Sequence, residues 1–576
     1  MKNITITGIC LILFFTLFSC EKGITDFLDK APGVDVTEDT IFSSKSQIET
    51  YVAGLYMQAV PSGLPLGNKL PGAQHTNDNI TDACTDAGEM GDTWYPSQVW
   101  NVGGIQANNI LNQEDYRFYY RWYGLRRANI LIERIDAANV DAAYKEQVKA
   151  EAKCLRAFLY LEMFKRYGGV PIVDKRLRLI DNMKVPRNSV KEVVDFIVKD
   201  CDEAAAVLPS SWVALSRGRV TKGVALMIKS KTLLYAASPL FNTATPYLDL
   251  GANNKLICYG NYDANRWKLA ADAAKAVLDW APGAGCILVN NQGVTKNYKY
   301  VWEKHDNSEI ILEYKGYPET DKGASAPWAR VKPRSIYSGW GGVSVPLNFV
   351  KFYEKTDGTP QTWDAGNNLN QKYAELDPRF AQTIAANGSR WNGDYPAIDM
   401  TVGGTDAANC FGGAWMHKLI PDELSNAKPK IVPLWINFRL AEAYLSYAEA
   451  LNEFQGPVQD AYDAVNTIRT RSGMPNLPSG LSKDEFRERV RNEETIEFAF
   501  EDHRLWDIRR WLIAENDGVM KGNMWGIKIN KLASPSTEFS FTPYVFEIRS
   551  FHPRMYLHPF IQKEVYLGYL IQNPGW

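Results

Sequence analysis

Apolar residues recur at helical spacing in several parts of this chain, and this periodicity restricts the fold more than any other feature. In the clearest case, Val148, Ala152, Leu155, Leu159 and Met163 fall on one face of a helix. Such a face is buried only if a second helix packs against it. We therefore predict helical hairpins, over about residues 119–171, 190–237, 266–279 and 436–472.

Small residues stand where two such helices would approach closely, which is typical of tetratricopeptide-like hairpins. The spacing between the units is irregular, so the period alone does not establish a regular solenoid. An ordinary helical bundle with alanine packing explains the same pattern equally well. The small residues are Ala128, Ala157, Ala225, Ala237, Ala273 and Ala448.

Two long stretches, residues 60–115 and 280–430, have no sustained period and are rich in glycine, proline, asparagine and aromatic residues. Long loops in a compact domain usually carry function or are disordered, and the aromatic content argues against disorder. We predict a mostly α fold in which these stretches form an irregular, loop-rich region with short strands. The ligand site is expected there.

The N-terminal residues have the character of an export signal. Ile4 to Phe18 is apolar but only about 15 residues long, shorter than the roughly 20 needed to span a bilayer. Cys20 follows Ser19 as in the bacterial lipobox, so we predict a signal peptide over residues 1–19 and lipidation at Cys20. The alternative is an ordinary signal peptide with a chance cysteine. Two or three acyl chains on Cys20 would hold residues 20–576 stably at a membrane.

Composition restricts the partners. The chain has 64 lysine and arginine residues against 66 aspartate and glutamate residues, and no basic run stands out. A nucleic-acid partner is therefore not expected. Of the cysteines that follow the leader, Cys154 and Cys201 lie on apolar helical faces and are expected to be buried. A disulfide between Cys258 and Cys286 is chemically allowed outside the cytoplasm, but the sequence does not establish its geometry.

Several segments spread along the chain carry a shared pattern. Its residues include Phe27, Leu28, Asp29 and Pro32; Ala128, Asn129, Glu151, Leu155, Arg156, Tyr160, Tyr167 and Gly168; Asp377, Pro378, Arg379 and Phe380; Arg439, Glu442 and Glu449; Asn466, Arg469, Arg471, Glu493, Glu497, Glu501, His503, Arg504, Asp507 and Arg510; and Gln572, Asn573, Pro574 and Gly575. Together these segments resemble one family, the SusD/RagB outer-membrane nutrient-binding lipoproteins of the Bacteroidetes. Two positions depart from its pattern: Glu494 and Asn437 stand where arginine is usual.

The resemblance implies a single unit over residues 20–576, with four tetratricopeptide-like helical hairpins forming a scaffold and an irregular part carrying the binding surface. It also implies an outer-membrane location facing the cell exterior. The implied partner is a SusC-like TonB-dependent transporter, to which the protein would deliver a captured oligosaccharide or polysaccharide.

Four charged residues near the C-terminus, Glu501, His503, Arg504 and Asp507, have helical spacing that could suggest a catalytic or metal site. We favour structural ion pairs, because a buried arginine needs carboxylate partners. No HExxH, P-loop, GxSxG or helix-preceding GxGxxG motif is present, so we predict no enzyme activity. A lipid-anchored glycoside hydrolase is the alternative, with Glu89 and Asp92 as the first carboxylates to test.

No cofactor is required, although oxygen ligands for a structural calcium ion gather in one loop. Their spacing does not match an EF-hand. The residues are Asn77, Asp78, Asn79, Asp82, Asp86 and Asp92.

Sugar binding needs flat aromatic faces against the C–H face of a pyranose and polar groups for its hydroxyls. Two clusters in the loop-rich stretches meet this need, and we predict that replacing Trp100 or Trp340 with alanine weakens glycan retention without lowering the melting temperature. A peptide is the alternative cargo. The candidate ligand contacts are Trp94, Tyr95, Trp100 and Asn101, and Trp328, Arg330, Tyr337 and Trp340.

Overall fold

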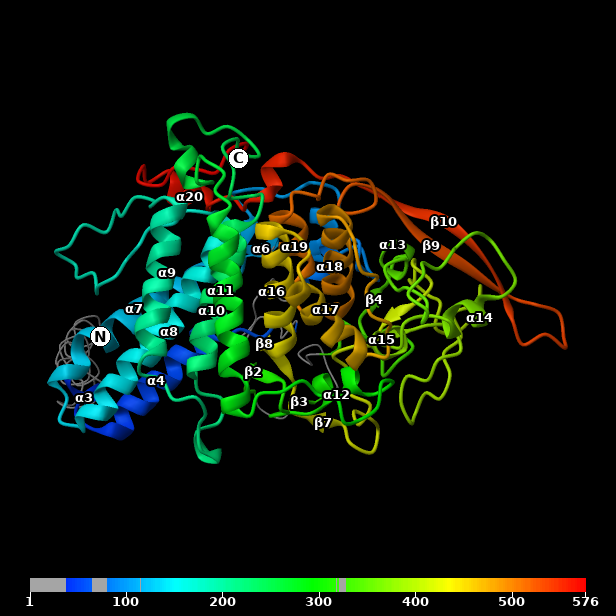
Figure 1. The fold of residues 1–576 in the computed structure, drawn as a ribbon, viewed down its shortest axis with the longest axis horizontal. Coiled ribbons are helices and arrows are strands. Elements are labelled where there is room, and N and C mark those ends of the chain that lie inside the picture. Colours follow the sequence, from blue (N-terminus) through cyan, green and yellow to red (C-terminus); the bar gives the residue numbers. More distant parts are fainter. Residues whose placement is uncertain (1–37, 65–79, 114, 317–318, 321–327) are drawn as a thin grey trace, which may run out of the picture.

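The computed structural model describes residues 38–64, 80–113, 115–316, 319–320 and 328–576. It confirms the predicted fold class, because the chain is mostly helical and its strands are short (Figure 1). The lipidation prediction for Cys20 and the calcium ligands Asn77, Asp78 and Asn79 lie outside the described residues.

Long helices packed side by side form one half of the molecule. The first five of them pack in chain order, each against the next, and α11 also packs against α16. That contact joins the N-terminal hairpins to the C-terminal ones (Figure 1). The helices are α7 (Phe118–Arg134), α8 (Ala142–Tyr167), α9 (Val190–Ala205), α10 (Lys222–Ala237), α11 (Asn265–Trp280), α16 (Leu440–Gln455), α17 (Gln459–Arg471) and α18 (Lys483–Glu497).

Local sequence fixes the ends of these helices. The side chain of Asp141 accepts hydrogen bonds from the backbone N–H groups of Ala143 and Tyr144 and so begins α8. Gly168, with φ of 73°, ends it. Ser189 and Glu192 form a reciprocal capping box at the start of α9.

Two long helices were not predicted. In α4 (Lys45–Ala59), the buried residues Ile48, Val52 and Leu55 have ordinary helical spacing, so the signal was present in the sequence. In α18 the buried face continues through Glu493 and Glu497, whose charge conceals the apolar period. The shorter helices are α3 (Glu38–Ile41), α5 (Pro96–Asn101), α6 (Ile110–Gln113), α12 (Asn297–Glu303), α13 (Leu347–Val350), α14 (Leu369–Ala374), α15 (Arg379–Thr383), α19 (Arg504–Arg510) and α20 (Gln562–Val565).

Short strands organise the loop-rich half. One sheet has the order β1-β4-β6-β5, and three further pairs are β2 with β8, β3 with β7 and β9 with β10. All of these pairings are antiparallel. The strands are β1 (Glu89–Met90), β2 (Ile310–Tyr314), β3 (Glu319–Thr320), β4 (Val343–Ser344), β5 (Ile384–Ala385), β6 (Trp415–Met416), β7 (Lys430–Ile431), β8 (Trp435–Arg439), β9 (Gly522–Lys531) and β10 (Phe539–Arg549).

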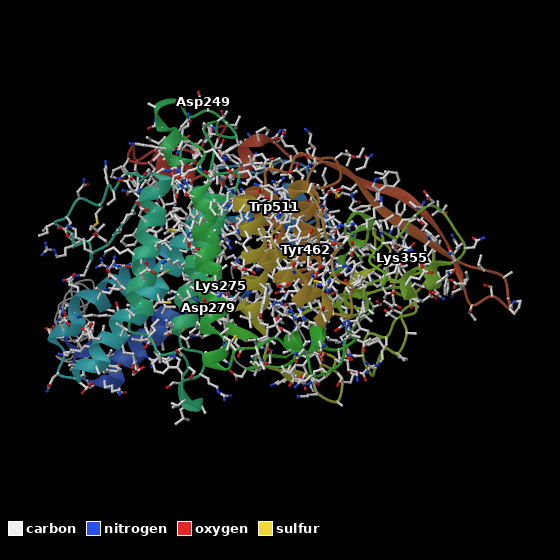
Figure 2. All side chains as sticks on the ribbon, in the orientation of Figure 1. Asp249, Lys275, Asp279, Lys355, Tyr462 and Trp511 are labelled. Carbon is white, nitrogen blue, oxygen red and sulfur yellow. The ribbon has the colours of Figure 1, made fainter. Side chains whose placement is uncertain are left out.

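Buried apolar side chains form two clusters, one among the long helices and one in the loop-rich half. Tyr462 of α17 belongs to the first, where its ring lies 4.8 Å from that of Phe486 in α18, and Figure 2 shows it in the middle of the molecule. Phe349 and Phe500 belong to the second, with ring centroids 5.7 Å apart. The two clusters correspond to the predicted scaffold and the predicted loop-rich region.

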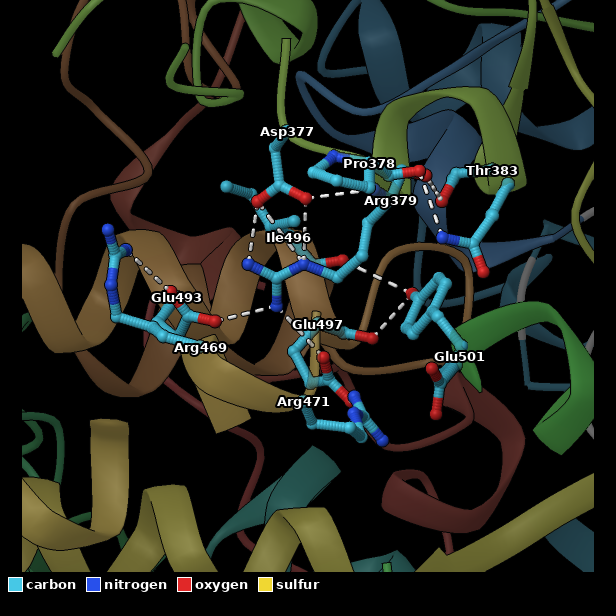
Figure 3. A network of polar contacts seen from close by, with 12 residues as sticks. Asp377, Pro378, Arg379, Thr383, Arg469, Arg471, Glu493, Ile496, Glu497 and Glu501 are labelled. Carbon is cyan, nitrogen blue, oxygen red and sulfur yellow. Dashed lines mark hydrogen bonds and ion pairs between the residues drawn. The ribbon is translucent and has the colours of Figure 1, made fainter. Parts of the chain in front are cut away.

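A buried ionic network lies between the two halves (Figure 3). Arg379, at the start of α15, is fully buried and bonds Asp377 at 2.8 Å, Glu493 at 2.6 Å and Glu497 at 2.9 Å. Asp377 lies in its own loop, but the two glutamates belong to α18. The guanidinium group of Arg379 therefore ties the loop-rich half to the helical half.

Glu497 is the centre of this network. Besides Arg379, its carboxylate accepts hydrogen bonds from Arg439 at 2.6 Å and from Arg471. Burial alone would raise the pKa of Glu497, but the three guanidinium groups together hold that pKa well below its usual range.

The predicted ion pairing is confirmed for three of the four charged residues near the C-terminus, Glu501, Arg504 and Asp507. Glu501 bonds Arg439 at 2.8 Å, and Arg504 bonds Asp86 at 2.6 Å. Asp507 bonds Arg510 at 2.8 Å. His503 stacks on the ring of Phe498 at 4.5 Å, and burial lowers the pKa of its imidazole.

The six described cysteines are all free thiols. Cys258 and Cys286 are among them, so the disulfide that the sequence allows is not formed in this structure. Cys154 and Cys201 are buried, as predicted. Among the described helices, none is both long enough and apolar enough to cross a membrane.

Candidate ligand-binding site

A pair of two-residue strands brings the two predicted aromatic clusters together. Glu89 of β1 lies opposite Ser344 of β4, and the Gly91 N–H extends the ladder to the Gly342 carbonyl at 3.0 Å. Because the strands are antiparallel, the chain that leaves β1 runs beside the chain that enters β4. A Cβ atom on Gly91 would lie 2.1 Å from the Gly341 carbonyl oxygen, so this close approach requires glycine.

Three aromatic side chains meet where these segments adjoin. The rings of Trp94 and Tyr95 are stacked 3.9 Å apart, and Trp340 meets Trp94 edge-on at 6.0 Å. Tyr95 is buried and donates a hydrogen bond from its hydroxyl to the Trp340 carbonyl at 3.1 Å. Trp94 is 49% exposed and Trp340 is partly exposed. Tyr95 thus supports two tryptophans that remain accessible.

An open cavity of about 440 Å³ lies against these tryptophans. Its volume falls within the range of small-molecule sites, roughly 300–1,000 Å³. We call this cavity the tryptophan groove, and the residues that line it are Trp94, Arg334, Ser338, Gly339 and Trp340.

Cations support the groove from two sides. Arg334 forms an ion pair with Asp92, which bridges the two segments that carry the aromatic residues. The Arg330 guanidinium is buried and lies 4.9 Å from the centre of the Trp340 ring, within reach of a cation–π contact. Arg334 is largely exposed, so its remaining N–H groups can donate to a ligand.

The loop that carries Trp340 has an unusual backbone. Tyr337 and Ser338 have φ of 49° and 54°, a left-handed conformation that non-glycine residues seldom adopt. A Cβ atom on Gly339 would lie 2.2 Å from the Lys332 carbonyl oxygen. The Tyr337 N–H donates to the Tyr395 hydroxyl at 3.0 Å, which holds the strained loop in place.

The phenol of Tyr337 adds to this bracing. It donates to Asp394 and accepts from the Asn392 amide at 2.9 Å. Burial, followed by the bond to Asp394, raises the pKa of Tyr337. Tyr337 therefore shapes the groove from behind and does not line it.

Six of the eight predicted ligand contacts do not line the groove. Tyr95, Arg330 and Tyr337 support it from behind, and the other three lie in the interior. Trp100 is 2% exposed and Trp328 is fully buried, with its indole N–H donating to the Leu419 carbonyl at 3.0 Å. Asn101 is buried and donates to Glu89 at 2.8 Å. Trp100, Asn101 and Trp328 belong to the protein interior and offer no surface to a ligand.

Arg334 and Ser338 line the groove but were not predicted. A weak signal existed, because Arg330, Lys332 and Arg334 alternate along one segment next to the predicted Trp340. The alternation does not reveal that Lys332 is buried whereas Arg334 is exposed. Ser338 carries no signal beyond its nearness to Trp340 in the sequence.

The two carboxylates considered for glycoside hydrolysis have structural partners. Glu89 is 3% exposed and binds Arg549, Gln98 and Asn101. Burial raises the pKa of Glu89 to about 8, against the opposing effect of Arg549. Asp92 is the partner of Arg334, and neither carboxylate lines the groove.

Those acidic residues considered for calcium that the structure describes already have partners within the protein. Asp86 is the partner of Arg504, and Asp82 accepts a hydrogen bond from the Phe500 N–H at 3.1 Å. Among the described residues, no group of three histidine, cysteine or acidic side chains could hold a metal ion. The calcium prediction depends on the residues outside the described part and stays a prediction.

Asp82 offers a test that depends on pH. Burial, and then the neighbouring charge of Asp502, raises the pKa of Asp82 from 3.8 to about 7. The folded state therefore binds more protons than the unfolded state between about pH 4 and 7, and this group destabilises the fold as pH rises through that window. Asp82→Asn should raise the melting temperature at pH 8 and leave it nearly unchanged at pH 4, for a gain of up to about 4 kcal/mol.

Thermal unfolding of both proteins at the two pH values measures this difference. Asp86→Asn is the matched control from the same loop, because it breaks the ion pair with Arg504 and should lower stability at pH 8. Equal shifts for Asp82→Asn at pH 4 and pH 8 would contradict the raised pKa.

Comparison with known families decides the classification. The model of the SusD family matches residues 303–576. A second SusD-like model, described as "Starch-binding associating with outer membrane", matches residues 26–234. The chain belongs to the SusD family.

Individual SusD-like proteins agree along nearly the whole chain. SusD-like protein P38 of Formosa agariphila is 25% identical over 529 residues, which cover 88% of this chain and 91% of the relative. A crystal structure of a SusD-like protein from Bacteroides fragilis has 28% identity and a TM-score of 0.77, with 95% and 100% of the two chains covered. Another B. fragilis structure, described as a SusD-like carbohydrate-binding protein, shares the fold with a TM-score of 0.72 at 21% identity, with 92% and 99% covered.

Several of the residues that carry the SusD resemblance form buried ion pairs. Asp377, Arg379, Glu497 and Arg504 all make ion pairs in the interior. Their role in this SusD-family chain is structural. The family motifs therefore specify the fold, whereas the groove residues must be found from the structure.

Proposed function

We propose that this protein is a surface-exposed glycan-binding lipoprotein. The observation that carries the proposal is the tryptophan groove, in which Trp94 and Trp340 stand edge-to-face beside the donors of Arg334 and Ser338. An indole face stacks on the C–H face of a pyranose, and guanidinium and hydroxyl groups bond its hydroxyls. Because Tyr95 and the strained loop hold both tryptophans in place, little ordering is needed on binding.

The partners of the nearby carboxylates favour binding of a glycan over its hydrolysis. The two best-placed carboxylates, Glu89 and Asp92, already have structural partners, and stacking with hydrogen bonds needs no cofactor. The matching family described as starch-binding and the B. fragilis protein described as carbohydrate-binding agree with a glycan ligand.

Location and partner complete the proposal. Cys20 carries the lipid anchor, the protein faces the exterior at the outer membrane, and it delivers its ligand to a SusC-like TonB-dependent transporter. Purification from native membranes in mild detergent tests the partnership: a large barrel protein should co-purify. Recovery of a solitary lipoprotein would count against it.

Replacing Trp340 or Trp94 with alanine should weaken glycan binding about five- to tenfold, because each loses an aromatic contact of about 1 kcal/mol. The melting temperature should change little, since neither indole is fully buried. Affinity electrophoresis against a polysaccharide panel, followed by calorimetric titration with the best ligand, measures the loss.

Tyr262→Ala is the control, because Tyr262 is 60% exposed and does not line the groove. Normal retention by both tryptophan variants would show that the groove is not the site. Competition by oligopeptides would point to the peptide alternative, and new reducing ends on incubation with polysaccharide would point to a hydrolase.

A further inference from the structure

The loop between α8 and α9 exposes an unusual amount of aliphatic surface. Leu179 is 99% exposed, Ile180 is 83% exposed and Met183 is 48% exposed. Single exposed aliphatic residues are normal in a folded protein, but three within five positions make a local apolar feature that calls for a partner. We call residues 174–186 the aliphatic loop.

The aliphatic loop is organised at its tip and anchored at its base. The Asp181 N–H donates to the Arg178 carbonyl at 2.9 Å, and the Arg178 N–H donates to the Asp181 carboxylate at 2.7 Å. Beside this turn, Arg126 donates to the Leu177 carbonyl at 2.6 Å, and at the base the Asn129 amide donates to the Lys175 carbonyl at 3.1 Å. The segment between α8 and α9 extends away from the helices at one end of the molecule (Figure 1).

Positive charge surrounds this tip. The loop contains four basic and two acidic side chains. Arg178 pairs with Asp181 and Arg176 pairs with Glu133, whereas Lys175 and Lys184 are exposed on the two sides of the aliphatic residues. An apolar tip flanked by lysine and arginine is complementary to a lipid surface, where acyl chains lie beneath anionic headgroups.

We propose that the aliphatic loop inserts Leu179 and Ile180 into a lipid surface that carries anionic headgroups. The shape of the loop favours lipid over protein as the partner. A stable protein interface needs roughly 800 Å² on each side and is enriched in aromatic residues, whereas this tip is small, protruding and aliphatic. A fluid bilayer adapts to such a tip without a matching surface.

The position of the aliphatic loop agrees with this role. The loop and α3, the first described element, both lie at the same end of the long axis (Figure 1). Contact at this end would add a second membrane attachment to the lipid anchor at Cys20 that the proposed function includes. The insertion itself requires neither the anchor nor the glycan ligand.

Vesicle flotation of the unlipidated mature chain, residues 20–576 with Cys20→Ala, tests the proposal. The vesicles are pure phosphatidylcholine, or phosphatidylcholine mixed with phosphatidylglycerol. We expect binding to the anionic vesicles, and the double variant Leu179→Ser/Ile180→Ser should lower it about tenfold or more, because two aliphatic side chains no longer leave water. Lys175→Glu/Lys184→Glu should lower binding to the anionic vesicles only.

The matched control is Val213→Ser/Leu215→Ser, which removes a pair of equally exposed aliphatic residues, 73% and 101% exposed, from another loop. This control should float like the unaltered chain. Absence of binding to anionic vesicles, or equal flotation of the Leu179→Ser/Ile180→Ser variant, would overturn the proposal. Unchanged flotation with lost barrel co-purification would identify a protein interface instead.

The same proteins separate this inference from the proposed function. Leu179→Ser/Ile180→Ser should retain glycan as the unaltered chain does, because the aliphatic loop does not line the tryptophan groove. Trp340→Ala should bind glycan more weakly and still float with the anionic vesicles. The experiments can therefore contradict membrane insertion by the aliphatic loop without contradicting glycan binding at the tryptophan groove, and the reverse.

Discussion

Replacing Trp100 with alanine is expected to lower the free energy of unfolding by about 3–5 kcal/mol, the usual cost of deleting a large buried aromatic side chain. Trp100 is 2% exposed and meets the His558 ring edge-on at 5.4 Å. The Arg509 guanidinium lies 5.7 Å from its ring centre. Its removal would leave a cavity between α5 and the C-terminal part of the chain. Chemical denaturation and calorimetry measure the loss.

Trp94→Ala is the matched control, since Trp94 lies six residues earlier in the chain and is 49% exposed. It should weaken glycan retention and leave the melting temperature nearly unchanged, whereas Trp100→Ala should lower the melting temperature clearly. This outcome reverses the prediction from sequence that Trp100→Ala spares stability. A Trp100→Ala protein with normal stability and poor glycan retention would restore the original prediction.

Replacing Glu497 with alanine should also destabilise the protein by about 3–5 kcal/mol, because three buried guanidinium groups each lose one of their carboxylate partners. Arg379 and Arg439 bond this carboxylate at 2.9 and 2.6 Å, and Arg471 is its third partner. All four side chains are buried, so water cannot replace the lost carboxylate. Denaturant unfolding gives the difference in free energy.

An exposed ion pair provides the control for this experiment. Lys275 and Asp279 are paired on the outer face of α11, with side chains 48% and 63% exposed (Figure 2). Asp279→Ala should change stability by no more than about 0.5 kcal/mol. If Glu497→Ala were equally mild, the network would contribute little to folding.

The helical scaffold was predictable because helix formation leaves a local period in the sequence. The stripe from Val148 to Met163 is buried in α8 as the period requires. Where charged residues extend a buried face, as Glu493 and Glu497 do in α18, the period disappears and the helix was missed. The sequence does not reveal that these charges are neutralised by arginines from distant segments.

The aromatic site was predictable only as a region. Trp94 and Trp100 lie in the same stretch of sequence, so its composition does not distinguish them. Their different exposure depends on contacts such as that between Trp100 and His558, which lies more than 400 residues later in the chain. The pairing of β1 with β4 was equally hidden, since two-residue strands leave no recognisable alternation. That pairing is what brings Trp94 to Trp340.

The buried ionic network restricts which segments can be exchanged between SusD-family proteins to make a chimera. Hydrogen bonds from a guanidinium group are directional, so Arg379 fixes the angle at which the loop-rich half meets α18 as well as its attachment. A chimera that imports residues 280–430 from another protein would need an arginine and an aspartate in the places of Arg379 and Asp377. It would also need the ion-pair partners that Glu309, Glu354 and Lys418 supply to the helical half.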